Sequence, residues 1–250
     1  MKNSVVILCL FLGALSAACS QAEPHTDPTV LITGANRGLG LEYARQFTEK
    51  GYNVIGTART PEDADALRAL GAKVVQLDVT SQQSVYALAA ELADQPIDIL
   101  INNAGYFNRE DITLEAASAD IFLRTMDINA AGPLRVTQAL IPNLMAGDMK
   151  KVISMSSQLG SIQRSSGQWY AYRASKTALN QINKIWSEEF SDQGFIFTVV
   201  HPGWVQTDMG GDNATYTPEE SVSGLLKVID GLAAQDNGAF YDLKGETIPW

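Results

Sequence analysis

The sequence predicts a single α/β domain in which helices cover both faces of a mostly parallel, doubly wound sheet of seven strands. Short apolar, β-branched runs alternate with helix-length amphipathic runs along the chain after residue 28, as in repeated βαβ units. The first of these runs leads into a glycine-rich turn and then into a helical pattern. The 250 residues, 46% of them hydrophobic, are enough for one core of this size.

The composition excludes several classes of site. A net charge of -10 disfavours nucleic acid and anionic membrane surfaces as partners. Both cysteines, Cys9 and Cys19, lie near the N-terminus, and the two histidines, His25 and His201, are far apart in the sequence. We therefore expect no disulfide framework, no thiol nucleophile and no metal site in the domain.

Residues 1–22 have the layout of a secretory signal peptide. Lys2 precedes an apolar run over residues 5–15 that is short for a membrane span, and small residues follow it. Residues 23–28 form a polar linker with two prolines, so we place the domain at residues 29–250.

The small residues before Cys19 resemble a bacterial lipoprotein signal, which would make this cysteine the site of a lipid anchor. Ser16 stands where such signals usually have leucine, and cleavage after Ala18 or Ala22 is the alternative. If the signal is used, we expect the protein to be exported or membrane-anchored on the periplasmic side. Otherwise we expect it to be cytoplasmic.

The glycine turn is the first binding element. It follows a predicted strand over residues 29–33 and precedes a predicted helix over residues 41–50. Glycines let the backbone approach a pyrophosphate, and the helix N-terminus offers free N–H groups, so a Rossmann-type dinucleotide site is expected here. The residues predicted to form it are Gly34, Asn36, Arg37, Gly38, Leu39 and Gly40.

The second strand, over residues 53–57, selects the cofactor. An NAD site carries Asp or Glu after this strand, whereas this chain has Ala58 and then Arg59. Together with Arg37 of the glycine turn, Arg59 favours the 2′-phosphate of NADP(H).

The next units are a helix over residues 61–70 with Thr60 as its cap, a strand over 73–77 and a helix over 81–93. Thr80 and Gln83 have capping-box spacing at the start of the second helix. Asp78 and Val79 follow the strand, where a doubly wound sheet meets an adenine ring.

A fully apolar strand over residues 96–101 ends in a small, polar segment that faces the ligand, with Asn103, Ala104 and Gly105. A long helical stretch over residues 116–145 is perturbed by Asn129 and by Gly132-Pro133. The strand over residues 151–155 then ends at Ser156 and Ser157.

Tyr172 and Lys176 lie four residues apart in a segment without internal Gly or Pro, and therefore on one face of a predicted helix. A nearby cation lowers the pKa of a phenol from about 10, so we expect Tyr172 to serve as a general acid or base. The last units are a strand over residues 195–200, a helix from residue 218 capped by Thr217 and Glu220, and a strand over 238–243.

Six motifs follow one another along the chain: Thr33-Gly34-x-x-x-Gly38-x-Gly40, Asn102-Asn103-Ala104-Gly105, Asn129, Ser157, Tyr172-x-x-x-Lys176 and Pro202-Gly203. With these motifs in this order, the chain resembles the short-chain dehydrogenase/reductase family over essentially all of residues 29–250. The sequence around Tyr172 and after His201 is most similar to that of the carbonyl reductase branch that includes the sniffer and C-factor proteins. The resemblance implies an NADP-dependent enzyme that acts on a small carbonyl substrate, and dimers or tetramers, which are common in the family.

The resemblance also assigns roles. Tyr172 would protonate the carbonyl oxygen, Lys176 would hold the ribose hydroxyls, and Ser157, with Ser156 as the alternative, would bind the carbonyl. Asn129 would hold the helix bend and a water in the proton path. The remaining cofactor residues would be Pro202, Gly203, Val205 and Thr207, and the substrate pocket would include Gln158, Trp169 and Trp204.

Two other functions compete with reduction. A serine hydrolase would use Ser157, His201 and Asp208, although the sequence around Ser157 is no nucleophile elbow. A cofactor-binding protein of this fold with a signalling role is the stronger alternative.

Overall fold

The computed structural model describes residues 27–250. The predicted signal peptide, with the anchor residue Cys19 and the alternative cleavage sites Ala18 and Ala22, lies outside the described residues. Among residues 27–250, no helix is both long enough and apolar enough to cross a membrane.

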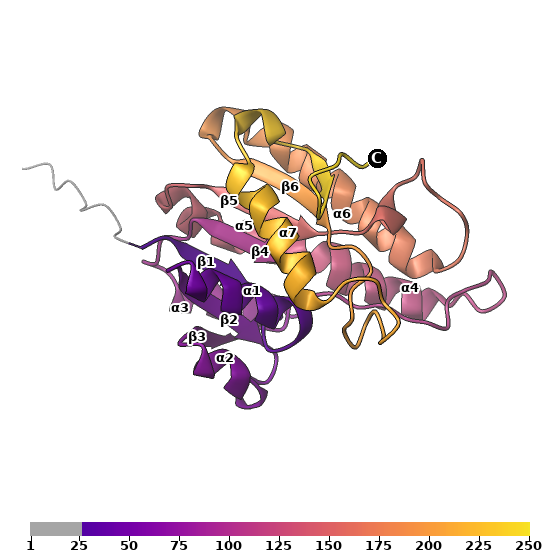
Figure 1. Ribbon diagram of the computed structural model, residues 1–250, viewed down its shortest axis with the longest axis horizontal. Coiled ribbons are helices and arrows are strands. Elements are labelled where there is room, and N and C mark those ends of the chain that lie inside the picture. Colours follow the sequence, from indigo (N-terminus) through magenta and orange to yellow (C-terminus); the bar gives the residue numbers. More distant parts are fainter. Residues whose placement is uncertain (1–26) are drawn as a thin grey trace, which may run out of the picture.

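One parallel sheet of seven strands forms the centre of the molecule, in the order β3-β2-β1-β4-β5-β6-β7 (Figure 1). The predicted doubly wound sheet is confirmed, and every pairing between neighbouring strands is parallel. The strands are β1 (Thr29–Ile32), β2 (Asn53–Ala58), β3 (Lys73–Gln76), β4 (Ile99–Asn102), β5 (Lys151–Met155), β6 (Ile196–His201) and β7 (Phe240–Asp242).

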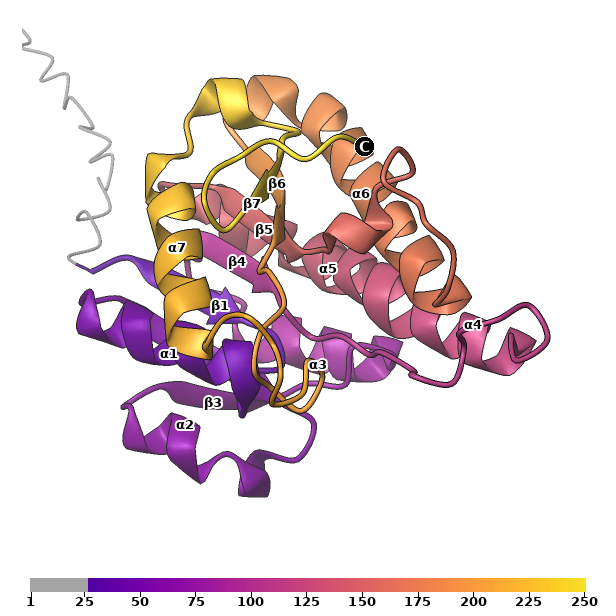
Figure 2. The ribbon, with the colours of Figure 1, turned by 45° about the vertical axis from the view of Figure 1, so that its right-hand side comes forward.

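Helices cover both faces of the sheet, so each face buries its own apolar core. Strand β1 shows this, because Val30 and Ile32 pack under α1 and α7, whereas Leu31 packs under α3 and α5. Helices α1 and α7 lie side by side over the first face (Figure 2). The helices are α1 (Gly38–Glu49), α2 (Asp65–Ala69), α3 (Gln82–Glu91), α4 (Ala119–Met126), α5 (Gly132–Ala146), α6 (Tyr170–Glu189) and α7 (Pro218–Gly231).

Two helix starts differ from the prediction. The segment after β2 is a 3₁₀ turn followed by the short α2, and the Thr60 side chain makes no capping bond. Helix α3 is capped by Ser81, which accepts from the Ser84 amide, and not by Thr80. The Thr80 amide instead donates to the Asp78 carboxylate and closes an Asx turn, and the Thr80 hydroxyl donates to the same oxygen.

The predicted perturbation at Asn129 is confirmed as a π-helical segment, Asp127–Ala131, between α4 and α5. A π segment carries one extra residue per turn and so turns a side chain toward a different face of the helix. Asn129 is thereby fully buried next to α6.

The chain order reverses between β1 and β4, which are hydrogen-bonded neighbours. The turn after β1 and the segment after β4 therefore meet at the carboxyl edge of the sheet. This switch point is where open α/β sheets bind ligands.

Candidate active site

Tyr172 and Lys176 lie on adjacent turns at the start of α6. The Lys176 ammonium is 5.5 Å from the centroid of the Tyr172 ring and donates to the Met155 carbonyl at the end of β5, at 2.8 Å. Lys176 is only 5% exposed, and the Met155 carbonyl holds its ammonium group inside the site. Helix spacing brings the two side chains together, as the sequence predicts.

The expected lowering of the tyrosine pKa is wrong for this arrangement. Burial raises the pKa of Tyr172 to about 12, and a hydrogen bond with Ser157 opposes the rise. Lys176 gives little help to the phenolate, because its ammonium bonds the Met155 carbonyl, and burial lowers the pKa of Lys176 to about 8. Tyr172 is consequently a protonated acid at neutral pH.

The two serines after β5 point in different directions. The Ser157 hydroxyl lies beside the Tyr172 phenol and accepts from the Leu159 amide at 3.1 Å. The Ser156 hydroxyl donates to Asn180 Oδ1 at 2.6 Å and is buried inside the protein. Of the two alternatives, only Ser157 shares a hydrogen bond with Tyr172.

Asn129 joins the segment after β4 to α6. Its Oδ1 accepts from the Tyr106 amide at 2.7 Å, and its Nδ2 donates to the Tyr106 carbonyl at 2.8 Å and to Ser175 Oγ at 3.0 Å. A Cβ built on Gly105 would lie 3.6 Å from Asn129 Oδ1 and 3.9 Å from Lys176 Nζ. Gly105 therefore borders the same space as two of the predicted catalytic side chains.

The glycine turn packs against the end of β4. Asn103 donates to the Thr33 and Gly34 carbonyls at 2.9 and 3.0 Å. A side chain at position 40 would clash, because a Cβ added to Gly40 would lie 2.2 Å from the Gly34 carbonyl oxygen. Gly34 has φ +65°, and a Cβ added to it would lie 3.2 Å from Ala104 Cα. Helix α1 then starts at Gly38 with no side-chain cap and no acidic residue in its first turn. Its free N–H groups can donate hydrogen bonds to an anion.

The predicted adenosine end is more open. Arg37 is exposed and pairs with Asp208 at 3.1 Å, and Arg59 is exposed at the end of β2. Hydrogen bonds from Thr80 lower the pKa of Asp78. Val79 is buried with its side chain close to Gly132. Asn36 and Leu39 are half-buried in the turn itself.

The segment after β6 covers the glycine turn from the other side. Thr207 Oγ1 accepts from the Gly210 amide at 3.2 Å, and a Cβ on Gly38 would lie 3.6 Å from Thr207 Cγ2. Val205 is buried, and the Pro202 carbonyl accepts from Ser221. Gly203 has φ +83°, which favours glycine. A cavity of about 360 Å³ opens between this segment and the start of α1.

Phe107 is a site residue that sequence reasoning missed. Its ring meets Tyr172 edge-on with centroids 4.9 Å apart and meets Trp169 at 5.7 Å. A single apolar residue in a polar loop carries no periodic signal, so only the fold shows it. Of the other predicted pocket residues, Gln158 starts a 3₁₀ turn after Ser157, and Trp204 is 54% exposed.

Comparison with known proteins identifies the family, because the short chain dehydrogenase model matches residues 28–217. This chain belongs to the short-chain dehydrogenase/reductase family. The C-signal of Myxococcus xanthus is 44% identical over 165 residues, which cover 66% of this chain and 99% of that protein.

Solved carbonyl reductases have the same fold. The NADPH-bound carbonyl reductase from chicken fatty liver is 32% identical with a TM-score of 0.83, covering 90% of this chain and 99% of that one. The carbonyl reductase Sniffer of D. melanogaster is 29% identical with a TM-score of 0.82, covering 90% and 100%. The predicted resemblance to the sniffer and C-factor branch is confirmed.

The alternative hydrolase triad of Ser157, His201 and Asp208 is not assembled. Asp208 pairs with Arg37, and burial lowers the pKa of His201 to about 4. The Nδ1 atom of His201 has no hydrogen-bond partner among residues 27–250, so nothing orients it as a base toward Ser157.

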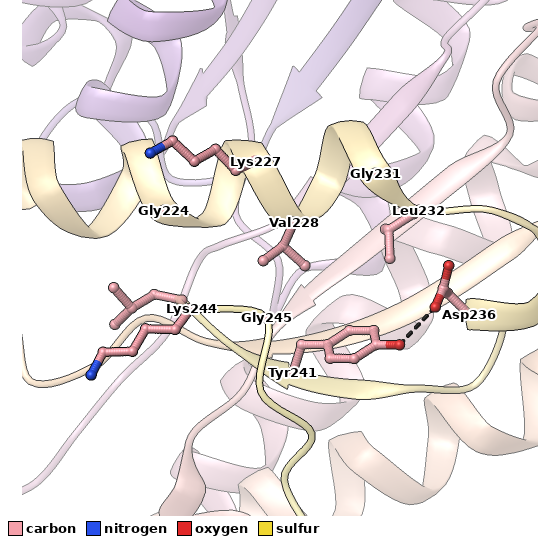
Figure 3. Close-up of a pocket in the computed structure, with 10 residues that line it drawn as sticks. Gly224, Lys227, Val228, Gly231, Leu232, Asp236, Tyr241, Lys244 and Gly245 are labelled. Carbon is pink, nitrogen blue, oxygen red and sulfur yellow. Dashed lines mark hydrogen bonds between the residues drawn. The ribbon is translucent and has the colours of Figure 1, made fainter.

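A second cavity, of about 530 Å³, lies away from these residues, between α7 and the chain after β7 (Figure 3). Tyr241 donates to Asp236 at one end of this cavity, at 2.6 Å, and Lys227 and Lys244 border the cavity on opposite sides. It shares no residue with the predicted site. Within the described part of the chain, no cluster of three or more His, Cys, Asp or Glu residues is placed to hold a metal ion.

Proposed function

We propose that this short-chain dehydrogenase is an NADPH-dependent reductase that converts the carbonyl of an aldehyde or ketone to an alcohol. The observation that carries the proposal is the convergence of Tyr172, Ser157 and Lys176 next to Gly105, at the edge of the sheet that also holds the glycine turn. A general acid, a hydrogen-bonding hydroxyl and a cation thus meet at the switch point.

The residues present fit a dinucleotide. Gly40 lets the start of α1 pack closely on the glycine turn, α1 starts with free N–H groups, and a cavity lined by Gly38 and Thr207 opens beside them. When bound, the cofactor supplies the hydride. Lys176, close to Gly105, would hold its ribose hydroxyls, and Thr207 would contact its nicotinamide amide.

The chain's own residues handle the proton. The Tyr172 phenol is protonated at neutral pH and donates to the carbonyl oxygen, and the Ser157 hydroxyl holds that oxygen beside the phenol. Asn129 bonds both the Tyr106 backbone and Ser175, so it fixes the position of the segment after β4 relative to α6. The family resemblance further suggests that Asn129 holds a water in the proton path.

We assign the preference for NADPH to Arg37 and Arg59. The 2′-phosphate would replace Asp208 as the partner of Arg37, an exchange favoured by the low strength of an exposed ion pair, about 0–1 kcal/mol. The similarity to the NADPH-bound chicken reductase supports this choice.

The test is consumption of NADPH, and separately of NADH, by the purified full-length chain with a panel of aldehydes, ketones and quinones. The proposal expects oxidation with several carbonyl compounds and a clear preference for NADPH. Binding of NADPH without turnover on any substrate would instead favour the signalling alternative, which the likeness to C-signal supports.

We further propose that residues 1–22 direct export, with Cys19 as the lipid-bearing residue. In this segment a basic residue, an apolar run and small residues follow one another in the order of such a signal. Mass spectrometry of fractionated cells tests it. A membrane-bound form that starts at a lipidated Cys19 supports the proposal, and full-length soluble protein alone contradicts it.

A further inference from the structure

A buried carboxylate caps the helix that carries Tyr172. Asp111, in the loop between β4 and α4, is 2% exposed, and its Oδ2 accepts from the backbone amide of Ala171, 60 positions along the chain. Ala171 is the second residue of α6 and directly precedes Tyr172. A carboxylate at a helix N-terminus is favoured both by the charge-assisted hydrogen bond and by the helix dipole.

Helix α6 has no cap of its own. Its N-cap position is Trp169, whose side chain makes no capping bond and whose backbone is left-handed, with φ 52° and ψ 56°. Gln168 before it is also left-handed, at φ 63°. Two consecutive non-glycine residues in this region are strained and persist only where their surroundings hold them. Asp111 is one of the groups that do so.

The Asp111 carboxylate is not arranged for stability alone. Its Oδ1 is buried without a hydrogen-bond partner among residues 27–250. Leaving a buried polar oxygen unpaired opposes folding, and such groups in native proteins are often found where function requires them. The Asp98 carboxylate, buried at the opposite edge of the sheet, instead uses both oxygens on the backbone amides of Thr29 and Asp148.

The loop that carries Asp111 touches the site at three successive points. The Tyr106 backbone bonds Asn129, the Phe107 ring meets Tyr172 edge-on, and Asp111 bonds Ala171. The loop therefore links Asn129 to the first turn of α6 and passes along one side of the Tyr172 phenol.

We propose that Asp111 is a positioning residue for Tyr172: its carboxylate holds the first turn of α6 so that the phenol faces Ser157. The inference rests on the proposed reductase function for its effect on turnover. The hydrogen bond to Ala171 is a property of the fold that can be measured without any substrate.

The experiment compares Asp111→Ala and Asp111→Asn with the wild type, and uses Asp98→Ala as a matched loss of a buried carboxylate at the far edge of the sheet. Steady-state rates with NADPH and a carbonyl substrate are measured at a temperature where circular dichroism shows all four proteins folded. Exchange of the Ala171 amide is followed by NMR in the wild type and Asp111→Asn.

Asp111→Ala should lower kcat about 10- to 100-fold, the cost of displacing a reacting group by about an ångström, while KM for NADPH changes less than about threefold. Asp111→Asn should recover most of the loss, since Asn caps helices about as well as Asp. Asp98→Ala should lower the melting temperature and leave kcat unchanged.

Equal kcat in Asp111→Ala and Asp98→Ala would overturn the inference, as would equal loss in Asp111→Ala and Asp111→Asn. If Asp111→Ala does not fold, the Ala171 amide decides: slow exchange in the wild type supports the assignment, and fast exchange there refutes it. An inactive wild type with a slowly exchanging Ala171 amide would count against the reductase function and not against the cap.

Discussion

The two serines after β5 allow a matched pair of single-atom changes. Ser157→Ala removes the hydroxyl beside the Tyr172 phenol, whereas Ser156→Ala removes the hydroxyl that donates to Asn180. Both residues are buried, at 6% and 3% exposed, and both changes delete one oxygen. Any difference between the variants therefore reports where each hydroxyl points.

Ser157→Ala should lower kcat about 10²- to 10³-fold, as found when one donor to a reacting oxygen is removed, because the carbonyl loses its hydrogen bond while the phenol remains. The Leu159 amide, which loses its partner, lies in the half-buried 3₁₀ turn that follows Ser157, so we expect only a small loss of fold stability. The melting temperature should stay close to the wild-type value.

Ser156→Ala should behave in the opposite way. It leaves Asn180 Oδ1 buried without a donor, which costs about 1–3 kcal/mol of unfolding free energy. For a domain of this length, each kcal/mol lowers the melting temperature by about 2–4 °C. Its kcat should remain within about threefold of wild type, since no reacting group is removed.

The assay is the initial rate of NADPH oxidation, with a thermal melt of the same preparations. A large kcat loss in Ser156→Ala with little in Ser157→Ala would refute the assignment of Ser157. Equal losses in both would show that the local packing, and not the hydroxyl beside Tyr172, determines the rate.

Further predictions concern the cofactor and pH. Arg37→Ala and Arg59→Ala should each weaken NADPH binding about 10- to 100-fold, because each removes a charged hydrogen bond that contributes about 1.5–3 kcal/mol. Binding of NADH, which lacks the 2′-phosphate, should stay unchanged. Fluorescence titration measures both affinities, and equal losses for the two cofactors would contradict the role given to these arginines. Burial lowers the pKa of Lys176 to about 8, so its ammonium form is present below that pH and is lost as pH rises through it. With NADPH as the varied substrate, kcat/KM should therefore fall above about pH 8, and this limb should be absent in Lys176→Arg, because arginine stays charged. Tyr172 cannot produce that limb, since burial raises its pKa to about 12.

The sheet could be predicted because each strand is a short apolar run bounded by turn residues, and because every crossover carries a recognisable helix. The capping box at Thr217 and Glu220 is confirmed, since both partners are local in sequence. The sequence pattern places the cap of α3 one residue too early, because Thr80 and Ser81 both offer a hydroxyl and only the turn at Asp78 decides between them.

The site could be predicted as a set of residues but not as an electrostatic arrangement. Helical spacing places Tyr172 beside Lys176, yet the direction of the tyrosine pKa depends on burial and on the Met155 carbonyl, a contact made across the fold. The same holds for the Asp111 cap and for the Phe107 ring, which come from a loop without periodicity.

The most direct test of the reductase mechanism is Tyr172→Phe, assayed for NADPH binding and for turnover in the same preparation. The ring and its contact with Phe107 remain, and only the acidic hydroxyl is lost. We expect NADPH affinity within about threefold of wild type and a loss of about 10²- to 10⁴-fold in kcat. Turnover at the wild-type rate would contradict it and would place the proton donor elsewhere.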